Sequence, residues 1–249
     1  MRKITVLVVA AHLCGMLGCE RRPPSDEECA LSEARSRIAV LATNVSARSI
    51  RESGKVRTLL RRIRQKSERD ALTTDWLEAL REVRVEGLRP TDRYVAVREV
   101  YHTIDTDVLG ALWEDGWSYE ERWSVRLDAV KWLDRQINAM RPSRECRSKT
   151  WLDWRNEDEK WSGYQALSEY RESEVENLEL NGFDEARYPK DVGKMAAIRA
   201  KFEQQIGRPV RRSEDVKYLG RYRREVASRI QKERAEAMRE MSAKDVKGK

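Results

Sequence analysis

Cysteine, histidine and phenylalanine are scarce in this chain of 249 residues, which has four Cys, two His and two Phe. Four cysteines exclude a disulfide-dense mini-scaffold, and twelve glycines with six prolines exclude a collagen-like chain. No apolar run reaches the roughly 20 residues that a membrane-spanning helix needs, which excludes a polytopic membrane protein. Eight Trp, eight Tyr and many spaced aliphatic residues remain to build a core, so one large domain or two small ones are expected.

Motifs of several enzyme classes are also missing. The chain has no P-loop, no G-x-G-x-x-G and no G-x-S-x-G, which argues against nucleotide hydrolysis, dinucleotide binding and α/β-hydrolase chemistry. It has no C-x-x-C for a zinc ribbon or a redox centre. The spacing of His102, Asp105 and Asp107 matches no strong metal motif, and we interpret His102 as structural. We therefore expect no catalytic residue, metal or cofactor.

The first residues have the three parts of a secretory signal. Residues 1–3 are a short basic start, residues 4–13 are an apolar run, and small residues precede Cys19. The apolar run is too short to cross a membrane. Residues 1–18 are therefore predicted to be a signal peptide, and His102 would be the one histidine left after its removal.

The end of this signal, Leu17, Gly18 and Cys19, resembles the lipobox of bacterial lipoproteins, with Met16 where Leu is usual. The resemblance covers only the first 19 residues. It implies cleavage before Cys19 and acylation of that cysteine, with palmitate as an expected fatty acid, so that the lipid holds the exported protein on a membrane. Glu20 stands where an inner-membrane retention signal has Asp, which favours the periplasmic face of the outer membrane. The alternative is a plain secretory signal with an incidental Cys19.

Residues 19–27, with two adjacent prolines, are expected to form an extended tether. Loss of the signal and lipidation of Cys19 leave Cys29 and Cys146, an even pair in an oxidising compartment. A disulfide between them would close a long loop and stabilise the fold by about 4 kcal/mol in the chain-entropy treatment. The alternative is two free thiols.

Apolar residues recur at spacings of three and four along residues 28–241. This period predicts one all-α domain, an irregular bundle of about 7–8 amphipathic helices, followed by a flexible tail at residues 242–249. Residues 91–105 are rich in β-favouring side chains, but we expect a helix there because no partner strand is evident. The expected helix starts are Ser25 or Asp26, Thr74 or Asp75, Ser118 and Ser213. The expected helix ends are Gly87, Pro142, Gly182 and Gly207.

Positive charge is concentrated in residues 48–69 and 208–249, each with a net charge of +7, on an otherwise acidic chain. They are either solvated helix faces with ion pairs or a surface for polyanions. An exported protein meets anionic lipid or glycan rather than nucleic acid, so no nucleic acid is expected as a partner. The candidate polyanion-binding residues are Arg57, Arg61, Arg62, Arg64, Arg211, Arg212, Arg221, Arg223 and Arg224.

All eight Trp lie between residues 76 and 161. Trp113 and Trp117, beside carboxylates, are candidate residues of an aromatic binding site, because aromatic faces stack on sugars and occur in interfaces. The core is expected to hold Trp123, Trp132 and Trp154.

Three functions remain open. The leading hypothesis is a non-enzymatic, membrane-anchored scaffold, adaptor or accessory subunit for an envelope protein, which should expose an apolar or aromatic patch. A glycan-acting enzyme of the cell wall should instead hold a carboxyl group of raised pKa beside aromatic side chains. The stretch from Arg51 to Gly54 resembles the Glu-Ser pair of lytic transglycosylases, although their downstream Gly-Leu-Met-Gln-type segment is missing. A binder of anionic glycan or lipid should bring both basic segments onto one face.

Overall fold

The computed structural model describes residues 24–43, 45–142, 151–211 and 220–247, without the side chains of 151–154 and 241–247. Within these ranges the chain forms helices and no strand, which confirms the predicted all-α bundle. The helices are α1 (Asp26–Thr43), α2 (Ala47–Ser53), α3 (Val56–Leu60), α4 (Lys66–Arg81), α5 (Pro90–His102), the π-helix η1 (Thr103–Val108), α6 (Leu109–Glu114), α7 (Tyr119–Met140), α8 (Trp151–Gly182), α9 (Val192–Ile206) and α10 (Arg221–Lys247).

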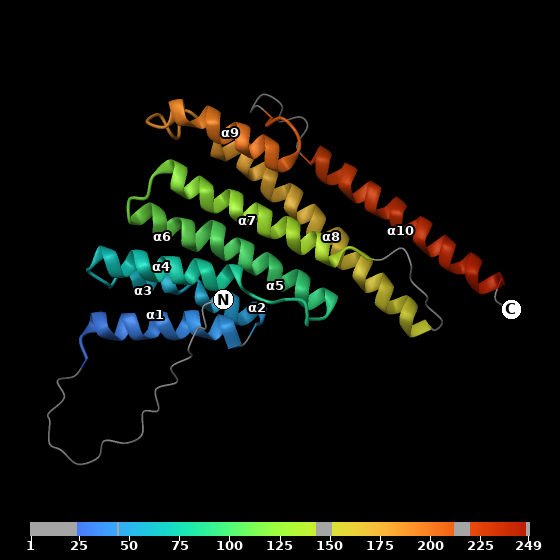
Figure 1. Ribbon diagram of the computed structural model, residues 1–249, viewed down its shortest axis with the longest axis horizontal. Coiled ribbons are helices and arrows are strands. Elements are labelled where there is room, and N and C mark those ends of the chain that lie inside the picture. Colours follow the sequence, from blue (N-terminus) through green and yellow to red (C-terminus); the bar gives the residue numbers. More distant parts are fainter. Residues whose placement is uncertain (1–23, 44, 143–150, 212–219, 248–249) are drawn as a thin grey trace, which may run out of the picture.

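The long helices lie beside one another with roughly aligned axes (Figure 1). Helix α1 forms one edge, followed by α4, by the continuous rod of α5, η1 and α6, and then by α7 and α8. Helix α9 packs on α7, and α10 packs along α8 at the edge farthest from α1. Among the described residues, no helix is long and apolar enough to span a membrane.

Most of the predicted helix boundaries are confirmed. The Ser118 hydroxyl accepts a hydrogen bond from the Glu121 backbone N–H, and the Glu121 carboxylate accepts one from Ser118, which is the predicted capping box. Gly207 ends α9 with a φ of 74°, a left-handed conformation that glycine adopts without strain. Residues 91–105 are helical as expected, and α8 ends at Gly182.

Three predicted boundaries need correction, and a fourth lies outside the described residues. Helix α4 ends at Arg81, six residues before the predicted end at Gly87. Helix α4 begins at Lys66, eight residues before the predicted start at Thr74, and it begins without a side-chain cap. Helix α10 continues to Lys247, past residue 242, where we predicted a flexible tail. The start predicted at Ser213 lies outside the described residues, and α10 is first described from Arg221.

An aromatic cluster joins α7, α8 and α9. The fully buried Trp123 of α7 stacks on Phe183 with ring centroids 4.6 Å apart, and Phe202 meets it edge-on at 5.5 Å. The Tyr119 hydroxyl donates a hydrogen bond to the carbonyl of Gly182 over 2.8 Å, and burial raises the pKa of Tyr119 to about 12. Trp123 and Trp132 are both buried, as predicted, whereas the side chain of Trp154 lies outside the described part.

The contact between Gly182 and Trp123 gives a test of this packing. A Cβ atom on Gly182 would overlap the Trp123 ring, so Gly182→Ala is expected to lower the free energy of unfolding by about 2 kcal/mol through overpacking. The control is Gly193→Ala in α9, where an added Cβ meets nothing and stability should stay equal or rise by up to about 1 kcal/mol. Urea unfolding of both variants measures the difference, and equal stabilities would contradict the packing.

Candidate docking groove

A hollow of about 950 Å³ runs between α1 and α4 at the edge of the bundle. We call it the α1–α4 groove. Its residues on the α1 side recur every three or four positions, as do those on α4, so each set lies along one helix face. Its lining consists of Arg35, Ile38, Ala39, Leu41, Ala42 and Val45 on the α1 side and Leu72, Asp75, Glu78, Ala79, Glu82 and Arg84 on the α4 side.

The space in the groove comes from small side chains between larger ones. Ala39, Ala42 and Ala79 line it, and Ala39 and Ala42 are exposed on the outer side of α1. The larger Ile38, Leu41 and Leu72 are buried beneath them and join the two helices. A methyl group covers much less of a helix surface than a Leu side chain does, so the helices touch at their base and leave an apolar channel above it.

The acidic side of the groove carries charges without partners. Asp75, Glu78 and Glu82 are exposed along one face of α4, and none of the three forms an ion pair with a residue that the structure describes. Many other carboxylates of the protein are paired, including Asp70 one turn earlier, which contacts Lys66 at 2.6 Å. Arg35 lies on the opposite side and Arg84 beyond the end of α4. The groove therefore combines an apolar floor with one unneutralised acidic wall.

The predicted basic segment 48–69 is largely neutralised by the protein itself. Arg57 and Arg61 both bind the carboxylate of Glu114, at 2.5 and 2.6 Å. The hydrogen bonds from Arg61 and Arg57 lower the pKa of Glu114 to about 2. Arg62 pairs with Asp26, while the backbone N–H of Arg64 donates to the carboxylate of Glu27 over 2.6 Å. These contacts fasten the segment to α1 and α6.

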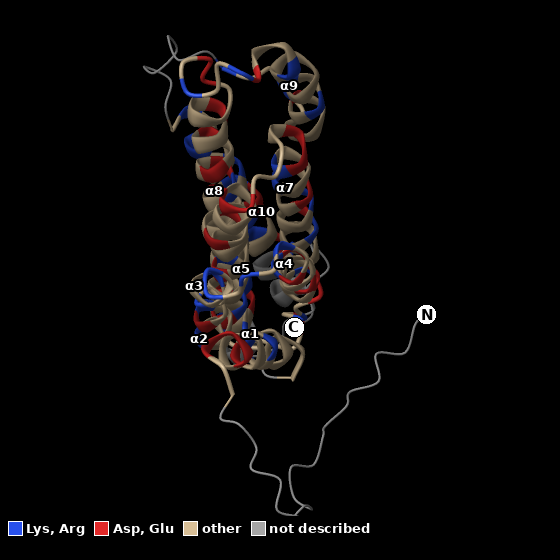
Figure 2. Ribbon diagram, turned by 90° about the vertical axis from the view of Figure 1, so that its left-hand side faces the viewer, with Lys and Arg blue, Asp and Glu red and all other residues tan. Residues whose placement is uncertain are grey.

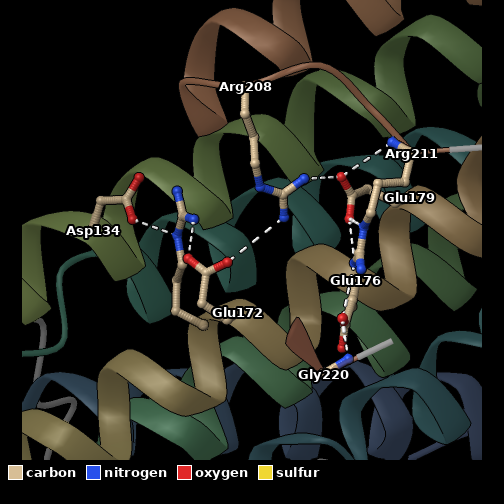
Figure 3. Close-up of polar contacts among 8 residues, drawn as sticks. Asp134, Glu172, Glu176, Glu179, Arg208, Arg211 and Gly220 are labelled. Carbon is tan, nitrogen blue, oxygen red and sulfur yellow. Dashed lines mark hydrogen bonds and ion pairs between the residues drawn. The ribbon is translucent and has the colours of Figure 1, made fainter. Parts of the chain in front are cut away.

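The second basic segment, residues 208–249, begins in a network with the carboxylates of α8 (Figure 3). Arg211 contacts Glu176 at 2.9 Å and Glu179 at 2.7 Å. Arg208 also binds Glu179, whose side chain is fully buried. The backbone N–H of Gly220 donates to Glu176 over 2.5 Å, so the same carboxylates fix the start of α10.

The remaining arginines of this segment lie on or near α10. Arg221 pairs with Glu225 at 2.8 Å and Arg223 with Glu169 at 3.4 Å, whereas Arg224 is exposed. Arg212 lies outside the described residues. Helix α10 and the segment 48–69 lie on opposite sides of the bundle (Figure 1), and Figure 2 shows Lys and Arg interleaved with Asp and Glu along the helices. The described parts of the two basic segments therefore lie on different faces of the bundle.

The two candidate aromatic residues have different environments. Trp113 is 57% exposed, the Arg122 guanidinium lies 4.0 Å from its ring centroid, and Tyr188 meets it edge-on. Trp117 is partly buried against the core and donates a hydrogen bond to Asp70 over 3.1 Å. Trp113 is therefore accessible, with one face covered by a cation, whereas Trp117 ties α4 to the start of α7.

The carboxyl groups argue against the lytic-transglycosylase resemblance. Hydrogen bonds from Lys55 and Arg37 lower the pKa of Glu52, whereas a general acid needs a raised one. Burial does raise the pKa of Glu174, which lies beside Tyr170, and that of Asp107, whose carboxylate lies against Gly54. Neither side chain lines the α1–α4 groove or any of four smaller hollows in the described part of the chain.

The candidate disulfide receives no support. Cys29 is a free, exposed thiol near the start of α1. Cys146 and the candidate lipidation residue Cys19 both lie outside the described residues. His102 is exposed, with its Nδ1 atom 3.5 Å from the Thr106 hydroxyl. In the described part, no cluster of His, Cys, Asp and Glu could hold a metal ion.

Comparison with known proteins finds no relative of this chain. The chain matches no protein-family model, no curated protein and no solved structure. The function must therefore be argued from the surface itself.

The α1–α4 groove was not predicted from the sequence. Two signals for it are present in the sequence. Ala39 and Ala42 interrupt the larger apolar residues of the first helix, and Asp75, Glu78 and Glu82 form an acidic stripe at spacings of three and four. Their combination becomes meaningful only once α1 and α4 are known to pack together.

The network of Figure 3 makes a prediction about stability. Glu179→Gln removes the charge that Arg208 and Arg211 share in a buried place, and we expect a loss of about 3 kcal/mol in the free energy of unfolding. Glu169→Gln on the same helix is the control, because its partner Arg223 is half exposed and the loss should stay below about 1 kcal/mol. Urea unfolding at pH 7 compares the two, and equal losses would contradict a structural role for the network.

Proposed function

We propose that this protein is a membrane-anchored, non-enzymatic lipoprotein of the bacterial envelope that acts as an adaptor, holding a segment of a partner protein in the α1–α4 groove. The observation that carries the proposal is the apolar floor of this groove beside its unneutralised acidic wall. Apolar patches rimmed by polar residues mark interaction sites on soluble domains. The lipobox resemblance at Cys19 supports the anchor, and Glu20 favours the outer membrane.

The groove defines the chemistry of its occupant. Its floor accommodates small or medium apolar side chains at helical spacing, as an amphipathic helix presents them. Asp75, Glu78 and Glu82 require Lys or Arg along the flank that faces α4. The proposed occupant is therefore an amphipathic protein segment with a basic flank.

The tether would place the groove close to the membrane. Six residues separate Cys19 from Asp26, where α1 begins, and an extended chain over these seven steps spans at most about 25 Å. A lipid on Cys19 would thus keep the start of α1 near the lipid headgroups, with the groove beginning about 14 Å farther along the helix, at Arg35. A partner held in the groove would therefore be a protein of the cell envelope.

The groove is tested by site-specific photocrosslinking in cells. A photoreactive residue at Ala42, in the groove, should give a covalent adduct with one partner, whereas the same residue at the exposed Val95 of α5 should not. Reversal of Asp75, Glu78 and Glu82 to Lys should lower the yield several-fold, because like charges then face the basic flank. Sequencing of the adduct should return an amphipathic segment with a basic flank. Equal adducts at Ala42 and Val95, or a yield unchanged by charge reversal, would refute the groove.

The anchor is tested separately. Wild-type protein expressed in a bacterial host should sediment with membranes and carry an acylated residue 19 by mass spectrometry, and Cys19→Ala should be soluble and unacylated. Cys29→Ala, which removes the exposed thiol of α1, is the control and should remain on the membrane. Wild-type protein with residues 1–18 retained and an unmodified Cys19 would disprove the anchor.

A further inference from the structure

A second hollow, of about 380 Å³, lies where the start of α5, the end of α7 and α8 meet. We call it the Arg93 hollow. Three cationic side chains line it, those of Arg93, Arg141 and Lys160, against one carboxylate, that of the exposed Glu86. The rest of its lining is less polar and consists of Leu88, Pro90, Ala139, Met140 and Pro142. The hollow is therefore a small site with excess positive charge, on the side of α5 away from the α1–α4 groove.

The guanidinium of Arg93 has an unused binding edge. Its Nε and Nη2 atoms are buried and have no hydrogen-bond partner among the described residues. These two nitrogens form the edge of a guanidinium that binds two oxygens of a carboxylate or a phosphate side by side. Burial lowers the pKa of Arg93, and Glu86 is the charge that partly opposes this effect without forming an ion pair.

Other arginines of the same protein show what normally occupies this edge. In six of them, Nε and Nη2 both donate hydrogen bonds to one carboxylate group. The pairs are Arg37 with Glu33, Arg51 with Glu99, Arg57 with Glu114, Arg61 with Glu114, Arg62 with Asp26, and Arg211 with Glu179. Arg93 has the same edge, with both nitrogens buried, but no carboxylate of the described residues bonds to it.

The other two cations are partly engaged and still contribute charge. Arg141 contacts Glu233 at 3.2 Å through Nη2, and Lys160 contacts Glu157 at 2.6 Å. Both side chains remain about half exposed, so they can turn toward a bound anion. Three cations against one exposed carboxylate suit an anion with more than one negative charge better than a single carboxylate.

We infer that the Arg93 hollow is a binding site for a small phosphate-type oxyanion, held by the Nε and Nη2 atoms of Arg93 and by the charges of Lys160 and Arg141. Inorganic phosphate is its simplest form, and a terminal phosphate on a lipid headgroup presents the same oxygens. The inference does not depend on the α1–α4 groove or on lipidation of Cys19. It gives the protein a second, chemically distinct ligand.

The test uses full-length protein titrated with inorganic phosphate at constant ionic strength and followed by calorimetry and thermal unfolding. Wild type should bind one phosphate, and Arg93→Gln should weaken binding about tenfold or more, because the paired donors are lost. Arg89→Gln, which removes an exposed arginine outside the hollow and paired with Asp92, should bind as wild type does. Phosphate also stabilises proteins without binding, so the difference between variants decides the result.

A second variant keeps the test valid if Arg93→Gln fails to fold. Lys160 is exposed, so Lys160→Gln should fold normally and weaken phosphate binding several-fold. Equal phosphate binding by wild type, Arg93→Gln and Lys160→Gln would overturn the inference, as would no binding to wild type. Soluble short-chain phosphatidic acid then distinguishes the sources. Tighter, Arg93-dependent binding of this lipid identifies a headgroup site, and binding of inorganic phosphate alone identifies a free anion.

Discussion

The C-terminal half of the fold depends on ion pairs between the buried carboxylates of α8 and arginine side chains. Glu172, Glu176 and Glu179 follow one another at spacings of four and three, so they share one face of the helix, and each is almost entirely buried. Charges in that position would be costly alone, and they are neutralised by Arg171 of the same helix and by Arg208 and Arg211 from the segment after α9. Arg208 and Arg211 follow α9 in the chain, and the backbone N–H of Gly220, just before α10, donates to Glu176. The same carboxylates therefore position the start of α10, which packs on α8.

The helices could be predicted wherever local chemistry specifies them. The capping box at Ser118 and the left-handed Gly207 act within one turn of sequence, and both lie where expected. The predicted start of α4 was wrong because the first two turns of this helix have little apolar character and no side-chain cap. That start is stabilised by contacts from elsewhere: Arg69 pairs with Asp115 at 2.6 Å and donates to the carbonyl of Ile63. Such a helix start cannot be recognised from spacing alone.

The candidate site was less predictable because its charges are paired over long distances in sequence. Arg57 and Arg61 looked like part of a free basic surface, yet their partner Glu114 lies more than fifty residues away. Trp113 and Trp117 looked alike in sequence, and only packing separates the exposed ring from the one bonded to Asp70. The location of the α1–α4 groove could not be predicted without knowing that α1 packs on α4.

The extent of this internal pairing gives weight to the charges that stay unpaired. A chain with 50 basic and 43 acidic side chains can neutralise most of them within itself, and long-range pairs join α1 to the residues after α3, α3 to α6, and α8 to the residues before α10. Two exceptions coincide with hollows: the acidic wall of α4 beside an apolar floor, and the buried edge of Arg93 beside two further cations. An unpaired exposed carboxylate costs little, but a buried guanidinium edge without an acceptor is unfavourable unless something outside the chain completes it. The ligands proposed for the two surfaces therefore have opposite charge, a basic protein segment in one and a small oxyanion in the other.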